Sequence, residues 1–342
     1  MITSSYRSWR NRALYERGAI PMLVDEDYRR VIGFITSDKI WNDRLKRYKR
    51  TPVATVFFLA MPHGFDKRES SGFTVYAITT KHSILPYKPD EKINIRVNME
   101  KGGYKDIETK ANDWIPNPVT DVAVCIMPSD RFTDCIVDWF QYDVIAPYSQ
   151  TAYSGFAAGD SVFSVGLFEG FSGNNEIMPI ARFGKISLMP HESEKIDAEI
   201  VRDTYTPITA YLAEMTSWEG QSGSPVFVYF QEGRYDCLEF EEQTAPRVER
   251  NEPTLIGLVQ GFFDVQGQKI NSGIMIVVPA QDIINTLMED ELVRDRQQAK
   301  EQKTEPRFKP KASSIETEKP LTKADFENAL KKASQKTSEP ES

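Results

Sequence analysis

The pattern of apolar and polar positions changes once along the chain, near Pro52. Before this point, apolar residues recur at helical spacing within 4–17 and again within 38–48. This period predicts two short amphipathic helices. We therefore interpret residues 1–50 as an N-terminal extension that is partly helical.

Beyond Pro52, short runs rich in Val, Ile, Phe, Tyr and Thr are separated by Gly, Asn, Asp and Pro. Such runs predict the strands of an all-β sandwich or barrel. Because they are too many for one small barrel, and 146–158 divides them into two sets, we predict a first β-barrel over 51–148 and a second over 149–294. The runs lie at 53–61, 72–80, 93–99, 121–127, 160–168, 181–189, 208–215, 224–230, 254–263 and 273–279.

The residue pattern and composition change again in the C-terminal part of the chain. Apolar residues on one face predict a helix over 279–294, which we assign to the second barrel. Residues 295–342 are rich in Lys, Glu, Gln, Pro and Ser, so we expect a disordered tail with one short helix at 322–334. This tail is a candidate docking segment for a regulatory protein, and the long connection 231–253 is a second candidate for controlling access.

Composition narrows the classes of function. The chain has 342 residues and a formal net charge of −8, which argues against nucleic-acid binding through a basic surface. No apolar stretch reaches the length of a membrane span, and no secretory signal is visible. The three cysteines lie far apart, so we expect no disulfide framework and a reduced, cytoplasmic protein. Neither CxxC nor HxxxH spacing occurs, and we expect no metal and no cofactor.

A glycine-rich turn contains the first candidate reactive side chain. The segment 220–225, GQSGSP, lies between two predicted strands. Glycines on both sides of Ser222 permit a tight turn that exposes its hydroxyl and directs the amides of Gly220 and Ser222 at one point. A plain glycine-serine turn explains this segment equally well when it is taken alone.

A serine nucleophile also needs a base to accept its proton and a carboxylate to orient that base. Of the three histidines, His82 ends a predicted strand, whereas His63 and His191 neighbour prolines. Asp121 opens another strand, where an aspartate is common for structural reasons alone. The chain order of His82, Asp121 and Ser222 is one of those known for serine triads. It assigns the base and the carboxylate to the first barrel and the nucleophile to the second.

These segments resemble the trypsin-like serine peptidases. Residues 80–82 (TKH) resemble the family's Ala-Ala-His block, 121–124 (DVAV) its Asp-Ile-Ala-Leu block, and 220–225 its Gly-Asp-Ser-Gly-Gly-Pro block. The form GxSGSPV is similar to bacterial glutamyl endopeptidases. The segments 159–166 and 273–280 are similar to the bacterial HtrA-like branch.

The resemblance covers roughly residues 50–290. It implies two six-stranded Greek-key β-barrels, flanked by helices, with the active site in the cleft between them. It implies a triad of His82, Asp121 and Ser222, an oxyanion hole made by the amides of Gly220 and Ser222, and endopeptidase activity on protein or peptide substrates. The alternative is a catalytically silent protein of this fold that binds other proteins. A cysteine peptidase is excluded because no cysteine occupies the nucleophile turn.

The resemblance also suggests residues for the substrate pocket. Thr216 stands where digestive members with a preference for basic residues carry an aspartate, and Gln260 stands where many members carry a serine that supports the triad. We therefore expect a small or medium uncharged side chain at the cleavage site. The pocket candidates are Thr216, Ser217, Gln260, Gly261 and Gly273.

Overall fold

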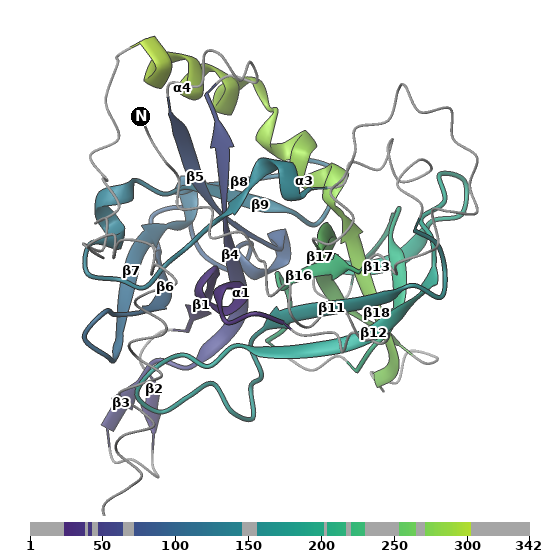
Figure 1. Ribbon diagram of the computed structural model, residues 1–342, viewed down its shortest axis with the longest axis horizontal. Helices are drawn as coiled ribbons and strands as arrows, with labels where there is room; N and C mark the ends of the chain where they lie inside the picture. Colours follow the sequence, from purple (N-terminus) through teal and green to yellow (C-terminus); the bar gives the residue numbers. More distant parts are fainter. Residues whose placement is uncertain are drawn as a thin grey trace, which may run out of the picture. The chain divides into compact units, whose positions relative to one another are not determined.

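The structure of the chain is a computed structural model. It describes residues 24–37, 40–42, 47–63, 72–145, 156–201, 204–216, 220–229, 253–264 and 271–301. Within these residues the chain forms two large β-sheets, two small hairpins and a few short helices (Figure 1). All ten strands predicted from the apolar runs are present.

The first sheet contains eight strands. Seven of them follow the spatial order β7-β6-β1-β4-β5-β9-β8, and β10 pairs with β4. The strands are β1 Ile32–Thr36, β4 Pro52–Pro62, β5 Phe73–Thr79, β6 Lys92–Asn98, β7 Tyr104–Lys110, β8 Trp114–Pro116, β9 Ala123–Ile126 and β10 Phe140–Gln141. The short 3-10 turns of this part are η1 Lys81–Ser83, η2 Ala111–Asp113, η3 Ser129–Phe132 and η4 Tyr142–Val144.

The second sheet closes on itself as a barrel in the order β11-β12-β15-β18-β17-β16. Its strands are β11 Ser161–Gly166, β12 Ile180–Leu188, β15 Tyr211–Glu214, β16 Pro225–Val228, β17 Thr254–Asp264 and β18 Asn271–Pro279. A hairpin of β13 Ile196–Val201 and β14 Thr204–Ile208 is inserted between β12 and β15.

The two sheets share one topology. Numbered by their appearance in the chain, the barrel strands follow the circular order 1-2-3-6-5-4. The path β7-β6-β1-β4-β5-β9 reads 5-4-1-2-3-6, which is the same circle opened between its fifth and sixth strands. Both contain the 4-1-2-3 order of a Greek key. The chain therefore has the two-barrel chymotrypsin fold, with the first barrel open along one seam.

Two expectations for the N-terminal part are wrong. Instead of a helix over 38–48, the chain forms a hairpin of β2 Ile40–Asn42 and β3 Arg47–Lys49, in which Trp41 stands opposite Tyr48. The first sheet also begins before residue 51, because β1 belongs to it. All of β1 is buried, so it has no alternation that could reveal a strand.

Several predicted segments lie outside the described residues. They are the helix over 4–17, most of 231–253, and the short helix at 322–334. No helix in the described part of the chain is long and apolar enough to cross a membrane.

Two strands of the closed barrel, β16 and the C-terminal half of β18, are buried on both faces. In β16, Val226 and Val228 lie in the barrel's own core, whereas Phe227 between them belongs to a larger core that includes the first sheet. Neighbouring residues of β18 are divided in the same way, with Val277 in the first of these cores and Val278 in the second. Two covered faces explain why the apolar runs are continuous instead of alternating.

Aromatic rings join the two sheets. Phe163 of β11 and Phe227 of β16 stack with centroids 5.0 Å apart. Phe140 of β10 and Tyr28 of helix α1 (Asp27–Arg30) lie 5.0 Å and 5.1 Å from the ring of Phe227. Segments from four parts of the chain thus meet at one joint, and pairs of this kind contribute about 0.5–1.5 kcal/mol beyond their burial.

The C-terminal helix predicted over 279–294 is present but divided, and it extends further than expected. Its two parts are α3 Ala280–Leu287 and α4 Asp290–Glu301. The expectation of disorder from residue 295 is therefore wrong for 295–301. Arg296 explains the difference, because its buried guanidinium donates to the Tyr76 hydroxyl at 2.8 Å and to the Leu287 carbonyl at 2.7 Å.

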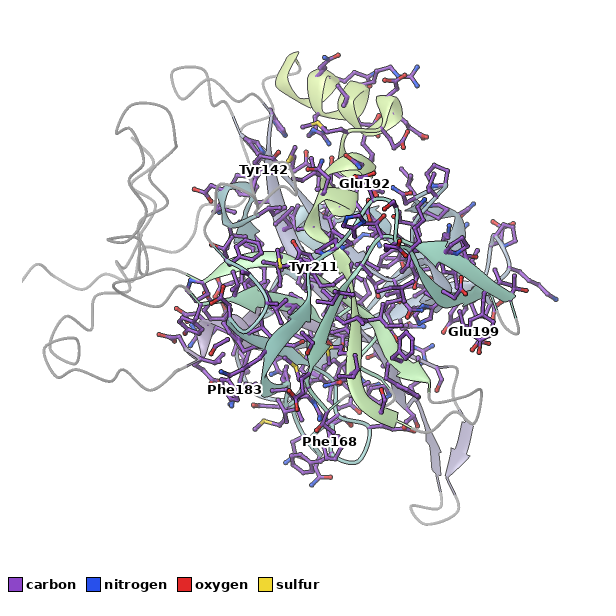
Figure 2. The ribbon with its side chains drawn as sticks, turned by 90° about the vertical axis from the view of Figure 1, so that its right-hand side faces the viewer. Tyr142, Phe168, Phe183, Glu192, Glu199 and Tyr211 are labelled. Carbon is purple, nitrogen blue, oxygen red and sulfur yellow. The ribbon has the colours of Figure 1, made fainter. Side chains whose placement is uncertain are left out.

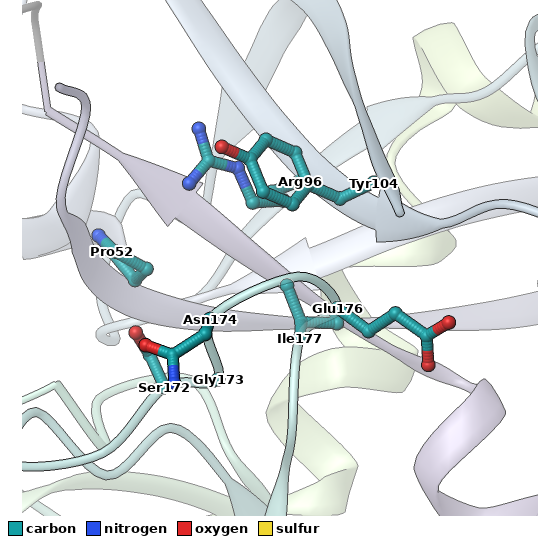
Figure 3. A pocket seen from close by; sticks show the side chains of 8 residues that line it. All are labelled: Pro52, Arg96, Tyr104, Ser172, Gly173, Asn174, Glu176 and Ile177. Atoms are coloured by element: carbon teal, nitrogen blue, oxygen red, sulfur yellow. The ribbon is translucent and has the colours of Figure 1, made fainter. Parts of the chain in front are cut away.

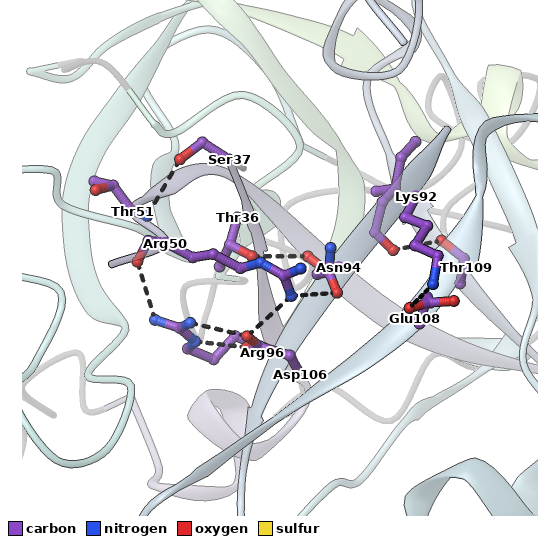
Figure 4. A network of polar contacts seen from close by, with 11 residues as sticks. Thr36, Ser37, Arg50, Thr51, Lys92, Asn94, Arg96, Asp106, Glu108 and Thr109 are labelled. Atoms are coloured by element: carbon purple, nitrogen blue, oxygen red, sulfur yellow. Dashed lines mark hydrogen bonds and ion pairs between the residues drawn. The ribbon is translucent and has the colours of Figure 1, made fainter. Parts of the chain in front are cut away.

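A small hollow lies between the first sheet and a loop of the second barrel (Figure 3). Arg96 forms one wall, where it stacks 3.9 Å over the ring of Tyr104 and binds Asp106 through Nε and Nη2 at 2.7 Å and 3.0 Å (Figure 4). The guanidinium is thus already paired. The lining shares no residue with the predicted active site; it consists of Pro52, Arg96, Tyr104, Ser172, Gly173, Asn174, Glu176 and Ile177.

Candidate active site

His82 and Asp121 are brought together by the pairing of two strands. His82 lies in η1, directly after β5, and Asp121 lies just before β9. β5 and β9 are antiparallel, with Thr79 opposite Ala123. The end of one strand is therefore adjacent to the start of the other.

Asp121 holds His82 at two points. Its Oδ1 atom accepts a hydrogen bond from the backbone N–H of His82 at 2.9 Å, and its Oδ2 atom lies 2.6 Å from Nδ1 of the ring. The carboxylate is completely buried, whereas the imidazole is 26% exposed. A carboxylate in this position keeps the proton on Nδ1 and leaves Nε2 as a proton acceptor.

Several groups determine the pKa of His82. Burial lowers it, but the charge and hydrogen bond of Asp121 and the charge of Glu199 raise it, and the net pKa lies above the usual 6.5. Glu199 belongs to β13, which packs against η1. Figure 2 shows Glu199 on this hairpin. An insertion of the second barrel therefore influences a side chain of the first.

Ser222 lies on the glycine turn that precedes β16. Gly220 and Gly223 flank it with φ angles of 88° and 85°, which favour glycine. The Gln221 carbonyl accepts a hydrogen bond from the Ser224 amide at 2.9 Å, inside the turn. Because the N–H of a trans peptide points opposite to its C=O, the Ser222 amide points away from the turn.

The hydroxyl of Ser222 is bound to a backbone carbonyl. It donates to the carbonyl oxygen of Gln260 at 3.1 Å, and no hydrogen bond to His82 is found in the part of the chain that the structure describes. His82 Nε2 lies 3.5 Å from the Thr80 hydroxyl, whose shorter contact of 2.6 Å is with Ser83. The histidine and the aspartate are thus joined, and the serine is held by a third group.

Gln260 connects the nucleophile turn to the inserted hairpin. It lies at a bulge in β17, is buried, and donates from Nε2 to the Glu199 carbonyl at 2.9 Å. At this position many trypsin-like peptidases carry a serine that supports the triad aspartate, and this chain has Gln260 instead. Here the side chain reaches β13, and both oxygens of Asp121 are bound by His82.

The other pocket candidates lie on neighbouring strands. Thr216 is exposed after β15, and its carbonyl accepts a hydrogen bond from Arg182 at 3.1 Å. The residue before it, Met215, donates its amide to the carbonyl of Gly273 at 2.9 Å. Gly261 follows Gln260 in β17, and Ser217 lies outside the described residues.

The sequence interpretation missed the hairpin that carries Glu199. Ile196, Ala198 and Ile200 are buried and alternate with more exposed residues, so a strand signal was present in 196–201. That signal does not indicate where a hairpin packs. The role of Glu199 is visible only once β13 lies against η1.

The described cysteines do not offer a second nucleophile. Cys125 is buried, and burial, with a smaller contribution from Asp113, raises the pKa of its thiol to about 12. Burial also raises the pKa of Cys135. Neither lies on the glycine turn. No group of three His, Cys, Asp or Glu side chains within the described ranges could hold a metal ion.

The chain has distant likenesses among solved structures. No family model matches the chain, and no curated protein matches it. Among solved structures, the MamO protease domain from Magnetospirillum magneticum shares 15% identity at a TM-score of 0.46, over 77% of this chain and 99% of that one. The active form of the Rv3671c protease from M. tuberculosis shares 13% identity at a TM-score of 0.42, over 79% and 91%. These likenesses concern the fold.

Proposed function

We propose that this protein is a serine endopeptidase with His82 as general base, Asp121 as the carboxylate that orients it, and Ser222 as nucleophile. The observation that carries the proposal is the two-point bond between Asp121 and His82. A structural aspartate at the start of a strand needs no histidine at 2.6 Å. A buried carboxylate that fixes the histidine tautomer is what a serine nucleophile requires.

The reaction begins with a rotation of the Ser222 side chain. Its hydroxyl leaves the Gln260 carbonyl and donates to Nε2 of His82. An extended substrate that offers a backbone N–H to the Gln260 carbonyl favours this rotation, because it competes for the same acceptor. Ser222 then attacks the scissile carbonyl while His82 takes its proton.

The amides of Gly220 and Ser222 stabilise the negative oxygen of the tetrahedral intermediate. His82 returns the proton to the leaving amine, and the acyl group stays on Ser222. A water molecule, deprotonated by His82, releases the acid and restores the enzyme. The balance is that of hydrolysis, with no oxidant, reductant or cofactor.

Labelling with a fluorophosphonate probe tests the proposal. We expect the full chain to be labelled and the variants Ser222→Ala and His82→Ala to remain unlabelled. The matched control is Ser164→Ala, since Ser164 is a buried serine of β11 whose hydroxyl has no hydrogen-bond partner in the structure. This control should be labelled like the wild type.

The alternative is a silent protein of this fold that binds peptides. It is favoured by the bond from the Ser222 hydroxyl to the Gln260 carbonyl, which leaves the nucleophile unactivated. A wild type that stays unlabelled but binds extended peptides, with binding reduced by substitution of Gln260, would replace the enzyme proposal with this one.

A further inference from the structure

One residue of the first sheet, Thr55 of β4, holds the nucleophile turn of the second barrel. Its amide donates to the Ser222 carbonyl at 2.9 Å, and its hydroxyl donates to the Gly220 carbonyl at 3.0 Å. Thr55 is completely buried. One residue of the opposite sheet therefore holds the carbonyls of the 220–221 and 222–223 peptides, and the 221–222 peptide that carries the Ser222 amide lies between them.

The Thr55 hydroxyl uses its full hydrogen-bonding capacity. It accepts from the Leu167 amide at 2.9 Å and from the Ser224 hydroxyl at 3.1 Å. A hydroxyl has one donor and two acceptor positions, so its hydrogen must point to the Gly220 carbonyl, which can only accept. The direction of this bond is thus determined by its neighbours.

The glycines around Thr55 allow a close approach that no larger residue would permit. A Cβ atom at Gly223 would overlap the Thr55 carbonyl, and one at Gly166 would overlap the Ser224 hydroxyl. A Cβ atom at Gly220 would lie 2.6 Å from Leu167 Cδ2. Because the turn is in direct contact with Thr55, a water molecule cannot replace the hydroxyl if it is removed.

Gly220 is the residue that most needs this restraint. Its positive φ angle of 88° favours glycine, and a glycine can change the orientation of its adjoining peptides at little cost. The hydrogen bond from Thr55 fixes the Gly220 carbonyl. The bond to the Ser222 carbonyl fixes the other end of the turn.

From these contacts, and resting on the proposed function, we propose that Thr55 is a positioning residue for the oxyanion hole. By holding the peptides 220–221 and 222–223, it fixes the turn that carries the Gly220 and Ser222 amides, so that both point in the direction that the tetrahedral intermediate requires. It touches neither the substrate nor the reacting atoms. Its effect should therefore appear in the transition state and not in substrate binding.

Two substitutions at this position separate the hydroxyl from the shape of the side chain. Thr55→Val keeps the shape and removes the hydroxyl, whereas Thr55→Ser keeps the hydroxyl. Direct loss of one oxyanion donor lowers kcat about 100- to 1,000-fold, so for an indirect effect we expect Thr55→Val to lower kcat about 10- to 100-fold. KM should stay within about twofold, and Thr55→Ser should remain near the wild type.

A peptide boronic acid provides a second measurement, because its tetrahedral adduct with Ser222 places an oxygen in the oxyanion hole. Its affinity should fall by the same factor as kcat in Thr55→Val. If Thr55→Val does not fold, Thr55→Cys replaces it, since a thiol is a weaker hydrogen-bond donor than a hydroxyl. In Thr55→Cys, kcat and boronate affinity should again fall together below the wild-type values.

The matched control is Thr109→Val. Thr109, labelled in Figure 4, is also a buried threonine of the first sheet. Its hydroxyl donates to the Ile93 carbonyl at 3.1 Å and accepts from the Trp114 ring N–H at 3.0 Å. Its loss should lower stability without lowering kcat. If the wild type is active, two results overturn the role of Thr55 and leave the proposed function standing. One is an unchanged kcat in Thr55→Val, and the other is a loss of kcat in Thr55→Ser as large as in Thr55→Val. A wild type with no turnover overturns the proposed function as well.

Discussion

The two barrels have the same circular strand order, but only the second is closed by hydrogen bonds. In the first, β8 pairs with β9, and β7 stays at the opposite end of the sheet. The second barrel has a core of its own. The core of the first sheet includes residues of the second barrel, of the inserted hairpin and of α3.

This difference shows which contacts determine the geometry of the candidate site. The open sheet carries His82 and Asp121, and the closed barrel presents Ser222 in the turn before β16. The open sheet completes its core only by packing against the other barrel. The relative position of His82 and Ser222 therefore depends on the joint between the sheets as much as on either sheet.

The largest expected effect comes from breaking the contribution of the open sheet. In Asp121→Asn, the amide NH2 faces Nδ1 of His82, so the ring must carry its proton on Nε2 and cannot accept one from Ser222. We expect kcat to fall about 10⁴-fold. Steady-state hydrolysis of a peptide substrate measures this.

The non-additivity of the same residues provides the control. In a Ser222→Ala background, Asp121→Asn should cause no further loss, because residues of one triad act as a unit. Activity that is retained in Asp121→Asn would show that the bond to His82 serves only the fold.

The joint itself is tested by Phe227→Ala. The Phe227 ring is completely buried and meets rings from both sheets, so we expect the free energy of unfolding to fall by about 3–5 kcal/mol. The control is Phe183→Ala in the same barrel, where the ring is 50% exposed and a change within about 0.5 kcal/mol is expected. Urea unfolding measures both, and equal losses would contradict the view that the joint is the critical contact.

The smallest expected effect concerns the charge of Glu199, which lies on the hairpin inserted in the second barrel and raises the pKa of His82 in the first. Because the pKa of His82 is raised above 6.5, kcat/KM should rise with pH through a midpoint above 6.5, where the base loses its proton. Glu199→Gln removes a charge that favours the protonated ring. The midpoint should therefore move to lower pH.

Glu192→Gln is the control for this pH profile. Glu192 is exposed and precedes the same hairpin, as Figure 2 shows. Its substitution should leave the midpoint in place. An unchanged midpoint in Glu199→Gln would mean that the hairpin covers the site without influencing its charge.

Much of the fold could be predicted from the sequence, because strands with apolar runs identify themselves locally. β1 was not predicted because it is buried throughout, and β7 was not predicted because it is largely polar. The hairpin β2–β3 was mistaken for a helix, since its apolar residues also fit a helical spacing. These errors occur where the spacing of apolar residues does not by itself distinguish a strand from a helix or a loop.

The sequence by itself determined the ten strands, the glycine turn around Ser222, and the three side chains proposed as a triad. Only the tertiary structure decided how they meet: the β5–β9 register that joins His82 to Asp121, and the carbonyl that holds the Ser222 hydroxyl. The anchoring of α4 by Arg296 was decided in the same way. The physical reason is that period and turn chemistry are local properties, whereas these contacts join segments far apart in the chain and exist only when the whole fold is packed.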